Sequence, residues 1–194
     1  MPTMIVLAGP NGAGKSTLYA NVVAPFFNGP FINADIIQRD EMGDPSPEAS
    51  YRAAEIATSR RAQRLHDRLD FVTETVFSHH SKVSLVREAK ANGFKVWVVH
   101  VGVAVADISV SRVNDRIDEG GHSVPESKIR ERFDRSAPLI RAAVHMADYG
   151  LVFDNSRINT DPRHCLTFHL DRLVHVAGDL PTWITSLYIP DFVV

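Results

Sequence analysis

A glycine-rich stretch near the start of the chain has the residue types and spacing of a phosphate-binding loop. Residues 9–16, GPNGAGKS, match the pattern G-x-x-x-x-G-K-[ST] between an apolar run and a segment typical of a helix. Glycines let the backbone wrap around phosphate with its N–H groups turned inward, and the N-terminus of the following helix adds partial positive charge. The alternative is a chance glycine-rich turn, and the strand–loop–helix context argues against it.

The loop predicts ATP as the nucleotide and Mg²⁺ as its metal. Lys15 is expected to reach the β- and γ-phosphates and so to act in catalysis, and the Ser16 hydroxyl is the predicted Mg²⁺ ligand. The residues predicted to contact the nucleotide belong to the loop and the first turn after it: Gly9, Asn11, Gly12, Ala13, Gly14, Lys15, Ser16 and Thr17.

Two acidic residues stand at the ends of predicted strands, where a parallel sheet delivers its functional side chains. Asp35 lies in FINADIIQRD and Glu74 in FVTETVFS. Phosphoryl transfer to a hydroxyl needs a carboxylate that orients the nucleophile and accepts its proton, and Asp35 is the predicted base. Glu74 is predicted to bind the acceptor, with Thr75 and Ser78 beside it.

Each acid also has another interpretation. In the alternative interpretations, Asp35 simply caps the helix that follows, and Glu74 supports the metal shell or is a solvated residue at a strand end. A separate Mg²⁺ acid is harder to find, because the usual context is an apolar strand that ends in aspartate. GLVFD offers Asp154 as a second candidate ligand, and Asp35 itself is a further option.

Five arginines flank a glycine pair in the segment RVNDRIDEGGHSVPESKIRERFDRS, residues 112–136. Two helices joined at the glycines would form a hairpin that closes over the site, and arginine suits it because its planar fork binds phosphate. The alternative is a solvated face, since interleaved acids offer weak surface ion pairs. We expect Arg116 and Arg132 to be the catalytic pair, while Arg112, Arg130 and Arg135 are the remaining three.

Strands alternate with helices through most of the chain, which predicts an α/β fold of the P-loop NTPase type with a mainly parallel sheet of five to six strands flanked by helices. We expect a single domain over residues 1–194 with a helical lid at about 105–135. The predicted strands are 4–9, 31–33, 71–77, 94–103, 151–153 and 165–170, and the long helices are 46–69, 105–118 and 124–147.

The net charge and the cysteine content indicate which partners and which compartment to expect for the protein. The formal net charge of −2 gives no reason to expect nucleic acid or an anionic membrane as partner. Cys165 is the only cysteine, which fits a reducing compartment, and the start of the chain lacks the features of a signal peptide. No apolar run approaches the roughly 20 residues that span a bilayer. We therefore expect a cytoplasmic protein.

Taken in order, several motifs resemble those of the zeta toxin family of P-loop kinases. They are GPNGAGKST, INADII, ETVFS, the arginine segment and MADYGLVFDNS, and they span about residues 4–156. Many families share the phosphate-binding loop, whereas the GGHSVPE stretch between arginines is more particular to this one.

The resemblance implies phosphorylation of UDP-N-acetylglucosamine by ATP at the 3′-hydroxyl of the amino sugar. It also implies that Lys15 and Ser16 hold ATP and Mg²⁺, that Asp35 is the base, that Glu74 binds the acceptor, and that Arg116 and Arg132 stabilise the transferring group. An antitoxin that covers the ATP site is the implied protein partner.

Two alternatives to this function stay open. The chain is shorter than well-known family toxins, and DIIQRD gives a less clear acceptor helix, so the alternative acceptor is another metabolite, a nucleotide or an antibiotic. A nucleotide-dependent switch without phosphoryl transfer is the third hypothesis, and the acid at a strand end together with the arginine segment argues against it.

Overall fold

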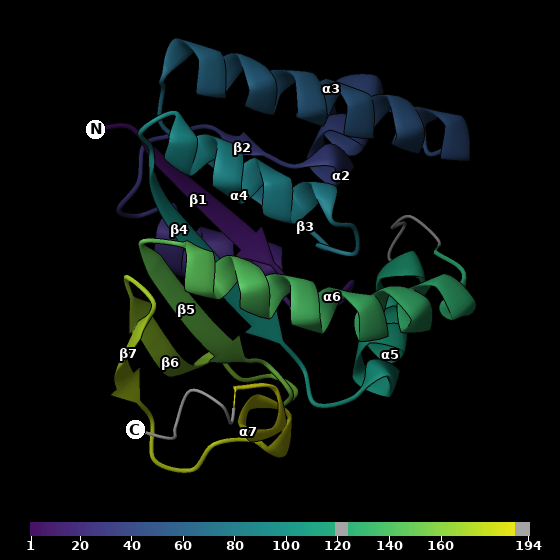
Figure 1. Ribbon diagram of the computed structural model, residues 1–194. Helices are drawn as coiled ribbons and strands as arrows, with labels where there is room; N and C mark the ends of the chain where they lie inside the picture. The colour runs from purple at the N-terminus through teal and green to yellow at the C-terminus, as the bar shows by residue number, and fades with distance from the viewer. Residues whose placement is uncertain (119–123, 189–194) are drawn as a thin grey trace.

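The structure, a computed structural model, describes residues 1–118 and 124–188, except for the side chains of 116–118. Its centre is a seven-stranded sheet in the order β2-β3-β1-β4-β5-β6-β7 (Figure 1). The first five strands in this order pair in parallel, and the last two are antiparallel. The strands are β1 (Thr3–Ala8), β2 (Phe31–Ile32), β3 (Phe71–Thr75), β4 (Lys95–Gly102), β5 (Tyr149–Asp154), β6 (Arg163–His169) and β7 (Arg172–Val176).

The α/β class with a mainly parallel sheet is confirmed, and the sheet has one strand more than the five to six expected. The additional strand is β7, whose residues are mostly exposed. An edge strand with neither face buried has no alternation of apolar and polar residues, so its sequence carries no strand signal. β1 shows the opposite case, because it lies between β3 and β4 and is almost wholly buried and apolar.

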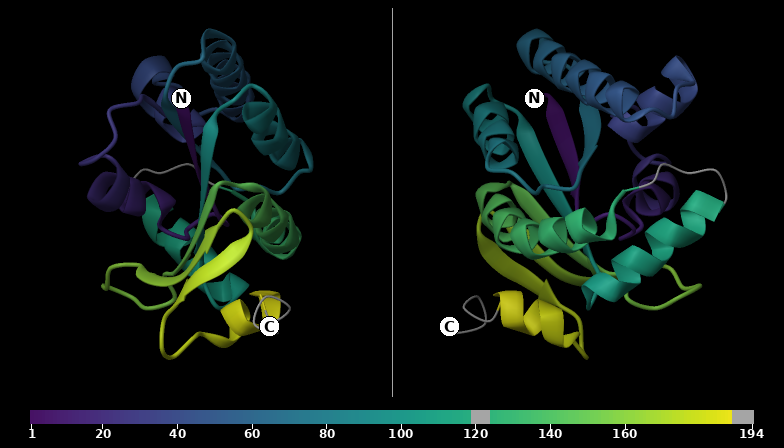
Figure 2. Two further views of the ribbon diagram at one scale, coloured as in Figure 1. Left: turned by 60° about the vertical axis from the view of Figure 1, so that its left-hand side comes forward. Right: turned by 90° about the vertical axis from the view of Figure 1, so that its right-hand side faces the viewer.

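Helices cover both faces of the sheet. α3, α4 and α6 lie on one face, and α1 with η1 lies on the other (Figure 2). The helices are α1 (Lys15–Leu18), η1 (Tyr19–Val23), α2 (Ala34–Ile36), η2 (Ile37–Met42), α3 (Pro47–Asp67), α4 (Ser81–Ala91), α5 (Ala106–Asp118), α6 (Glu126–Met146) and α7 (Thr182–Tyr188), where η marks a π-helical turn.

The long helix α3 begins where its sequence predicts. The Ser46 hydroxyl accepts a hydrogen bond from the Ala49 N–H at 3.1 Å, and Pro47 occupies the first helical position. Ala49, Ala53 and Ala57 are fully buried at every fourth position, so small side chains bring the helix close to the sheet. The same stripe continues with a buried arginine, Arg61.

The third strand is shorter than predicted. It ends at Thr75 rather than at residue 77, because Phe77 adopts a left-handed backbone conformation with φ of 62°. The Phe77 N–H donates to the Thr75 hydroxyl at 3.2 Å, and the Phe77 side chain is fully buried. The strand therefore turns immediately after Glu74 and Thr75, which leaves Ser78 in the loop before α4.

The two predicted lid helices are present as α5 and α6. They pack against each other through a small apolar cluster of Val110, Val113 and Ile129. The glycine pair between the two helices lies outside the described residues. Among the helices of residues 1–118 and 124–188, none is long and apolar enough to cross a membrane.

One carboxylate fastens the amino-terminal end of the sheet to α4. Asp148 accepts a hydrogen bond from the Val96 N–H at 2.7 Å and another from the Lys90 ammonium at 2.9 Å. Partial burial alone would raise the pKa of Asp148, but these two donors outweigh it and hold that pKa below its ordinary value. The folded protein therefore favours the charged form of the Asp148 carboxylate.

We expect Asp148→Asn to lower the free energy of unfolding by about 1–3 kcal/mol at neutral pH, the range for charge-assisted hydrogen bonds. Because the folded pKa lies below the unfolded one, this stabilisation is present above the ordinary aspartate pKa and is lost as pH falls through the folded pKa. Urea unfolding at pH 7 and below pH 4 measures it. Asp134→Asn, at an exposed position, should change little at either pH. An equal deficit at both pH values would contradict the assignment.

Candidate active site

The loop after β1 has the shape that its glycines permit. Gly14 has φ of 88°, and a Cβ there would lie 2.3 Å from the Asn155 amide nitrogen. A Cβ on Gly9 would lie 2.0 Å from the Val101 carbonyl oxygen. Both contacts are far below van der Waals distance. A side chain at position 9 would push the loop away from β4, and one at position 14 would displace the Asn155 side chain.

Two side chains hold the loop from the β4 and β5 side. The Asn155 amide donates to the Ala13 carbonyl at 2.9 Å, while the Asn155 N–H donates to the Gly102 carbonyl at 2.8 Å. Arg112 donates to the Gly12 carbonyl at 3.4 Å and to the Arg157 carbonyl at 2.9 Å. Sequence reasoning did not predict this support of the loop, although Asn155 directly follows β5, where functional side chains are expected.

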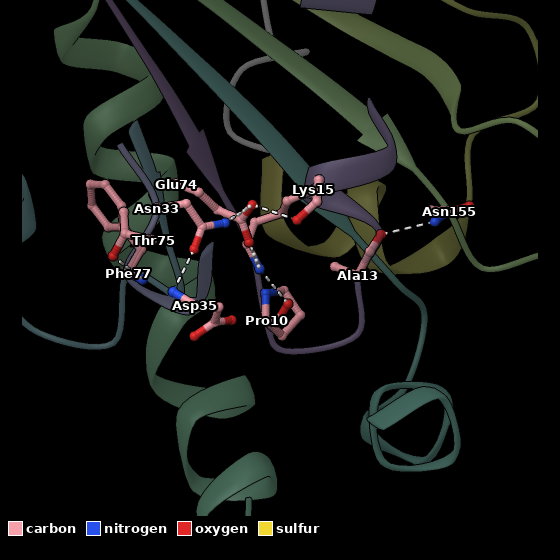
Figure 3. Close-up of polar contacts among 10 residues, drawn as sticks. Pro10, Ala13, Lys15, Asn33, Asp35, Glu74, Thr75, Phe77 and Asn155 are labelled. Carbon is pink, nitrogen blue, oxygen red and sulfur yellow. Dashed lines mark hydrogen bonds and ion pairs between the residues drawn. The ribbon is translucent and has the colours of Figure 1, made fainter. Parts of the chain in front are cut away.

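The Glu74 carboxylate is bonded to the loop itself. One of its oxygens accepts hydrogen bonds from the Ser16 hydroxyl at 2.8 Å and from the Asn33 amide at 2.9 Å. The other lies 3.5 Å from the Lys15 ammonium, which also donates to the Pro10 carbonyl at 2.9 Å. Figure 3 shows Glu74 between Asn33 and Lys15. Glu74 therefore connects the end of β3 to both functional side chains of the phosphate-binding loop.

Asp35 is attached to the same network through Asn33. The Asn33 side chain accepts a hydrogen bond from the Asp35 N–H at 2.8 Å and is the N-cap of α2. The capping interpretation of Asp35 is therefore wrong, because the cap is Asn33. The Asp35 side chain itself is exposed, and it forms no bond with the side chains that the structure describes. Asn33 is a site residue that sequence reasoning missed, and asparagine before a short helix was the available signal.

The other predicted acceptor residues lie beside this network. Thr75 ends β3, and its hydroxyl accepts the Phe77 N–H that turns the chain. Ser78 is half-buried in the loop that leads to α4. Their roles toward an acceptor stay predictions.

Asp154 has a structural role. Its carboxylate accepts hydrogen bonds from the Trp183 indole N–H at 2.7 Å and from the Ser156 hydroxyl at 2.5 Å. These bonds fasten α7 and the loop after β5 to the end of the sheet, and the role of Asp154 as a second Mg²⁺ ligand stays a prediction. Within residues 1–118 and 124–188, no group of three or more His, Cys, Asp or Glu side chains is placed to hold a metal.

The arginines of the lid segment differ in their partners. Arg130 pairs with Asp107 at 2.7 Å and with Glu126 at 2.8 Å. Arg135 pairs with Glu131 at 3.1 Å. Arg132 is half-buried and has no ion pair with any side chain that the structure describes. The side chain of Arg116 lies outside the described residues, so its predicted role stays a prediction.

A small cavity of about 110 Å³ lies between Pro10, α6 and α7. His100 and Trp183 line it, and burial lowers the pKa of His100 to about 3, so its ring is neutral at physiological pH. The volume is below the roughly 300 Å³ at which small-molecule sites begin, so the cavity cannot hold a nucleotide.

Known proteins resemble the chain in sequence and in fold. A protein of Haemophilus influenzae described as uncharacterized is 28% identical over 134 residues, which cover 66% of this chain and 91% of that protein. A chain from the AvrRxo1-ORF1:-ORF2 complex with ATP has a TM-score of 0.69 and 15% identity, covering 98% of this chain and 63% of its own length. This chain thus spans less than two thirds of that relative.

A chain from the PezAT chromosomal toxin–antitoxin system of Streptococcus pneumoniae has a TM-score of 0.65 and 15% identity, covering 98% of this chain and 84% of its own length. At such identities the likeness establishes a shared fold.

The sequence profile described as Zeta toxin matches residues 1–161, a span that holds the phosphate-binding loop, both strand-end acids and the arginine segment. This match supports phosphotransfer of the P-loop kinase type. Because the match covers most of its length, the chain belongs to the zeta toxin family.

Proposed function

We propose that the protein transfers the γ-phosphoryl group of ATP to a hydroxyl of a small acceptor, a sugar nucleotide such as UDP-N-acetylglucosamine. One observation carries the proposal. Hydrogen bonds run from Ser16 through Glu74 and Asn33 to the backbone of Asp35. These bonds connect the backbone of Asp35, whose carboxylate is exposed, to the phosphate-binding loop, and hydroxyl phosphorylation needs a carboxylate near that loop.

Asp35 accepts the proton of the acceptor hydroxyl while that oxygen bonds to the γ-phosphorus and the bond from phosphorus to the ADP oxygen breaks. Exposure leaves its carboxylate available to an incoming hydroxyl, and Asn33 fixes the backbone that carries it. Lys15 balances the negative charge of the phosphates. The arginines of the lid segment offset the negative charge that develops on the transferring phosphoryl group.

The loop residues fit Mg²⁺. The metal prefers oxygen ligands and keeps several of its waters, and the Ser16 hydroxyl and Glu74 carboxylate offer oxygens within 2.8 Å of each other. When bound, Mg²⁺ neutralises charge on the β- and γ-phosphates. Glu74 is therefore assigned to the support of the metal shell as well as to the acceptor side.

Family membership supports the identity of the acceptor and a protein partner. The PezAT and AvrRxo1 structures come from a toxin–antitoxin system and from a two-protein complex, so an antitoxin-like partner is part of the proposal. The alternative acceptor is another hydroxyl metabolite, because neither relative has a sequence close enough to carry over a substrate.

We expect Asp35→Asn to lower turnover by roughly 10²–10⁴-fold, the usual contribution of a general base, with ATP affinity unchanged. ADP release measures turnover, and displacement of a fluorescent ATP analogue measures affinity. Asp40→Asn is the matched control, since Asp40 is an exposed acid nearby that pairs only with Arg39 among the described side chains. Wild-type turnover in the Asp35→Asn variant would contradict the assignment of Asp35 as the general base.

We expect Arg132→Ala to reduce kcat by about 10³-fold or more, because an arginine aimed at the transferring group contributes at that scale. Arg130→Ala and Arg135→Ala are controls on the same helix. Their guanidinium groups are tied up in surface ion pairs, so their kcat should stay within a few-fold of wild type. Equal losses in all three variants would indicate damage to α6 rather than a catalytic arginine.

Mass spectrometry of the reaction products identifies the acceptor. The protein is incubated with ATP and UDP-N-acetylglucosamine, and in parallel with ATP and a bacterial metabolite extract. The expected result is a UDP-N-acetylglucosamine species that gains one phosphoryl group, absent with Asp35→Asn. If only the reaction with the extract gives a phosphorylated product, the acceptor is another metabolite. If neither reaction gives one, the nucleotide-dependent switch is favoured.

A further inference from the structure

The carboxamide of Asn155 lies directly against one peptide group of the phosphate-binding loop. Asn155 is 9% exposed, and its side chain donates to the Ala13 carbonyl at 2.9 Å. A Cβ on Gly14 would lie 2.3 Å from the same amide nitrogen, so no other atom fits between the carboxamide and the peptide that joins Ala13 to Gly14. In Figure 3 the bond from Asn155 reaches Ala13 from the side opposite Glu74 and Asp35.

This bond also determines where the next N–H points. All peptide bonds of the described residues are trans, and in a planar trans peptide the carbonyl and the N–H point in opposite directions. Because the Ala13 carbonyl points to Asn155, the Gly14 N–H points away from it. The Gly14 N–H has no hydrogen-bond acceptor among the residues that the structure describes. It is therefore a donor left open on the side of the loop that faces away from Asn155.

The backbone that carries Asn155 is itself fastened to the end of β4. The Asn155 N–H donates to the Gly102 carbonyl at 2.8 Å, and the Ser156 hydroxyl accepts from the Ala104 N–H at 2.8 Å. A group whose position is fixed before a ligand binds loses little further conformational freedom on binding. The carboxamide is thus held in place to orient the loop in the absence of any ligand.

We propose that Asn155 is a positioning residue for nucleotide binding, which aims the Gly14 N–H at a phosphate oxygen of ATP without touching the nucleotide itself. Backbone N–H groups bind phosphate only where they converge on it, and Gly14 is also the N-cap of α1, whose first N–H groups are open as well. Without the Asn155 donor, the Ala13 carbonyl can turn inward, where its negative end repels phosphate. This inference rests on the proposed function, since it assigns a further residue of the same nucleotide site.

Binding of phosphate alone tests this role apart from catalysis. Inorganic tripolyphosphate is titrated calorimetrically at fixed free Mg²⁺, and its displacement by ATP identifies the site. Asn155→Leu keeps the branched shape of the side chain and removes the donor without adding charge. Asn92→Leu is the matched control, because the Asn92 carboxamide likewise donates to a backbone carbonyl, that of Glu88, at 3.0 Å, but at the C-terminal end of α4.

We expect Asn155→Leu to weaken the binding of tripolyphosphate and of ATP by roughly tenfold each, the scale of one charge-assisted hydrogen bond, while Asn92→Leu matches wild type. The affinity for adenosine, which carries no phosphate, should not change. Wild-type affinity for tripolyphosphate in Asn155→Leu would overturn the proposal. An equal loss of adenosine binding would also overturn it, because that result indicates general damage to the nucleotide site.

A measurement on the wild-type protein keeps the proposal testable if Asn155→Leu fails to fold. In nuclear magnetic resonance spectra of protein labelled with ¹⁵N-glycine, the Gly14 amide proton should move downfield when Mg²⁺ and tripolyphosphate bind, because it becomes a hydrogen-bond donor to phosphate. In a folded Asn155→Leu variant this movement should be much smaller at saturation. A Gly14 amide signal that does not move in wild type would refute the role of Asn155.

Kinetics separate this inference from the proposed function. With UDP-N-acetylglucosamine as acceptor, Asn155→Leu should raise the KM for ATP by roughly tenfold and leave the KM for the acceptor unchanged. A residue that only stabilises the fold would lower the unfolding temperature without this selective change. Absence of any phosphorylated product would refute the proposed function, whereas the titration and the Gly14 signal would still decide the role of Asn155.

Discussion

The carboxylate of Glu74 is the interaction on which the rest of the site depends. It accepts hydrogen bonds from Ser16 and Asn33 and lies beside the buried Lys15 ammonium. Only an ionised carboxylate can accept several donors at once and also balance a buried cation. Because β3 pairs with β1 so that Glu74 lies opposite Leu7, the sheet places this group beside the loop that follows β1. The nucleotide side and the acceptor side of the site therefore share one anchor.

Local sequence patterns predicted those structural features that depend on residues close to one another in the chain. The loop spacing, the Ser46 cap of α3 and the i,i+4 pairs of Arg130 with Glu126 and Arg135 with Glu131 follow from short-range geometry. Contacts between distant segments could not be predicted in the same way. Arg112 meets a carbonyl a hundred residues away, and Glu74 meets Ser16 only because β3 lies next to β1. The position of Glu74 at a strand end predicts that it lies beside the phosphate-binding loop, as an acceptor ligand or a support of the metal shell. Its bonds to Ser16 and Asn33 could not be predicted, because strand order is not encoded in local pattern.

The Arg61 position illustrates a second reason for the limits of sequence reasoning. It continues the stripe of Ala49, Ala53 and Ala57 on the buried face of α3, yet arginine in a helix normally signals the exposed face. Helical spacing alone predicts that the residue is buried, whereas residue type alone predicts that it is exposed. A conflict between these two signals is itself informative, because proteins depart from local rules mainly at functional or strained positions.

Two buried cations of the chain, Lys15 and Arg61, differ in how their charge is offset. Lys15 has Glu74 at 3.5 Å and the Pro10 carbonyl at 2.9 Å, whereas Arg61 has only hydroxyl partners among the described side chains. A 3.5 Å separation is longer than a good hydrogen bond, so Lys15 can exchange this contact for phosphate at small cost. Arg61 has no such contact to exchange, because its partners among the described side chains are neutral hydroxyl groups.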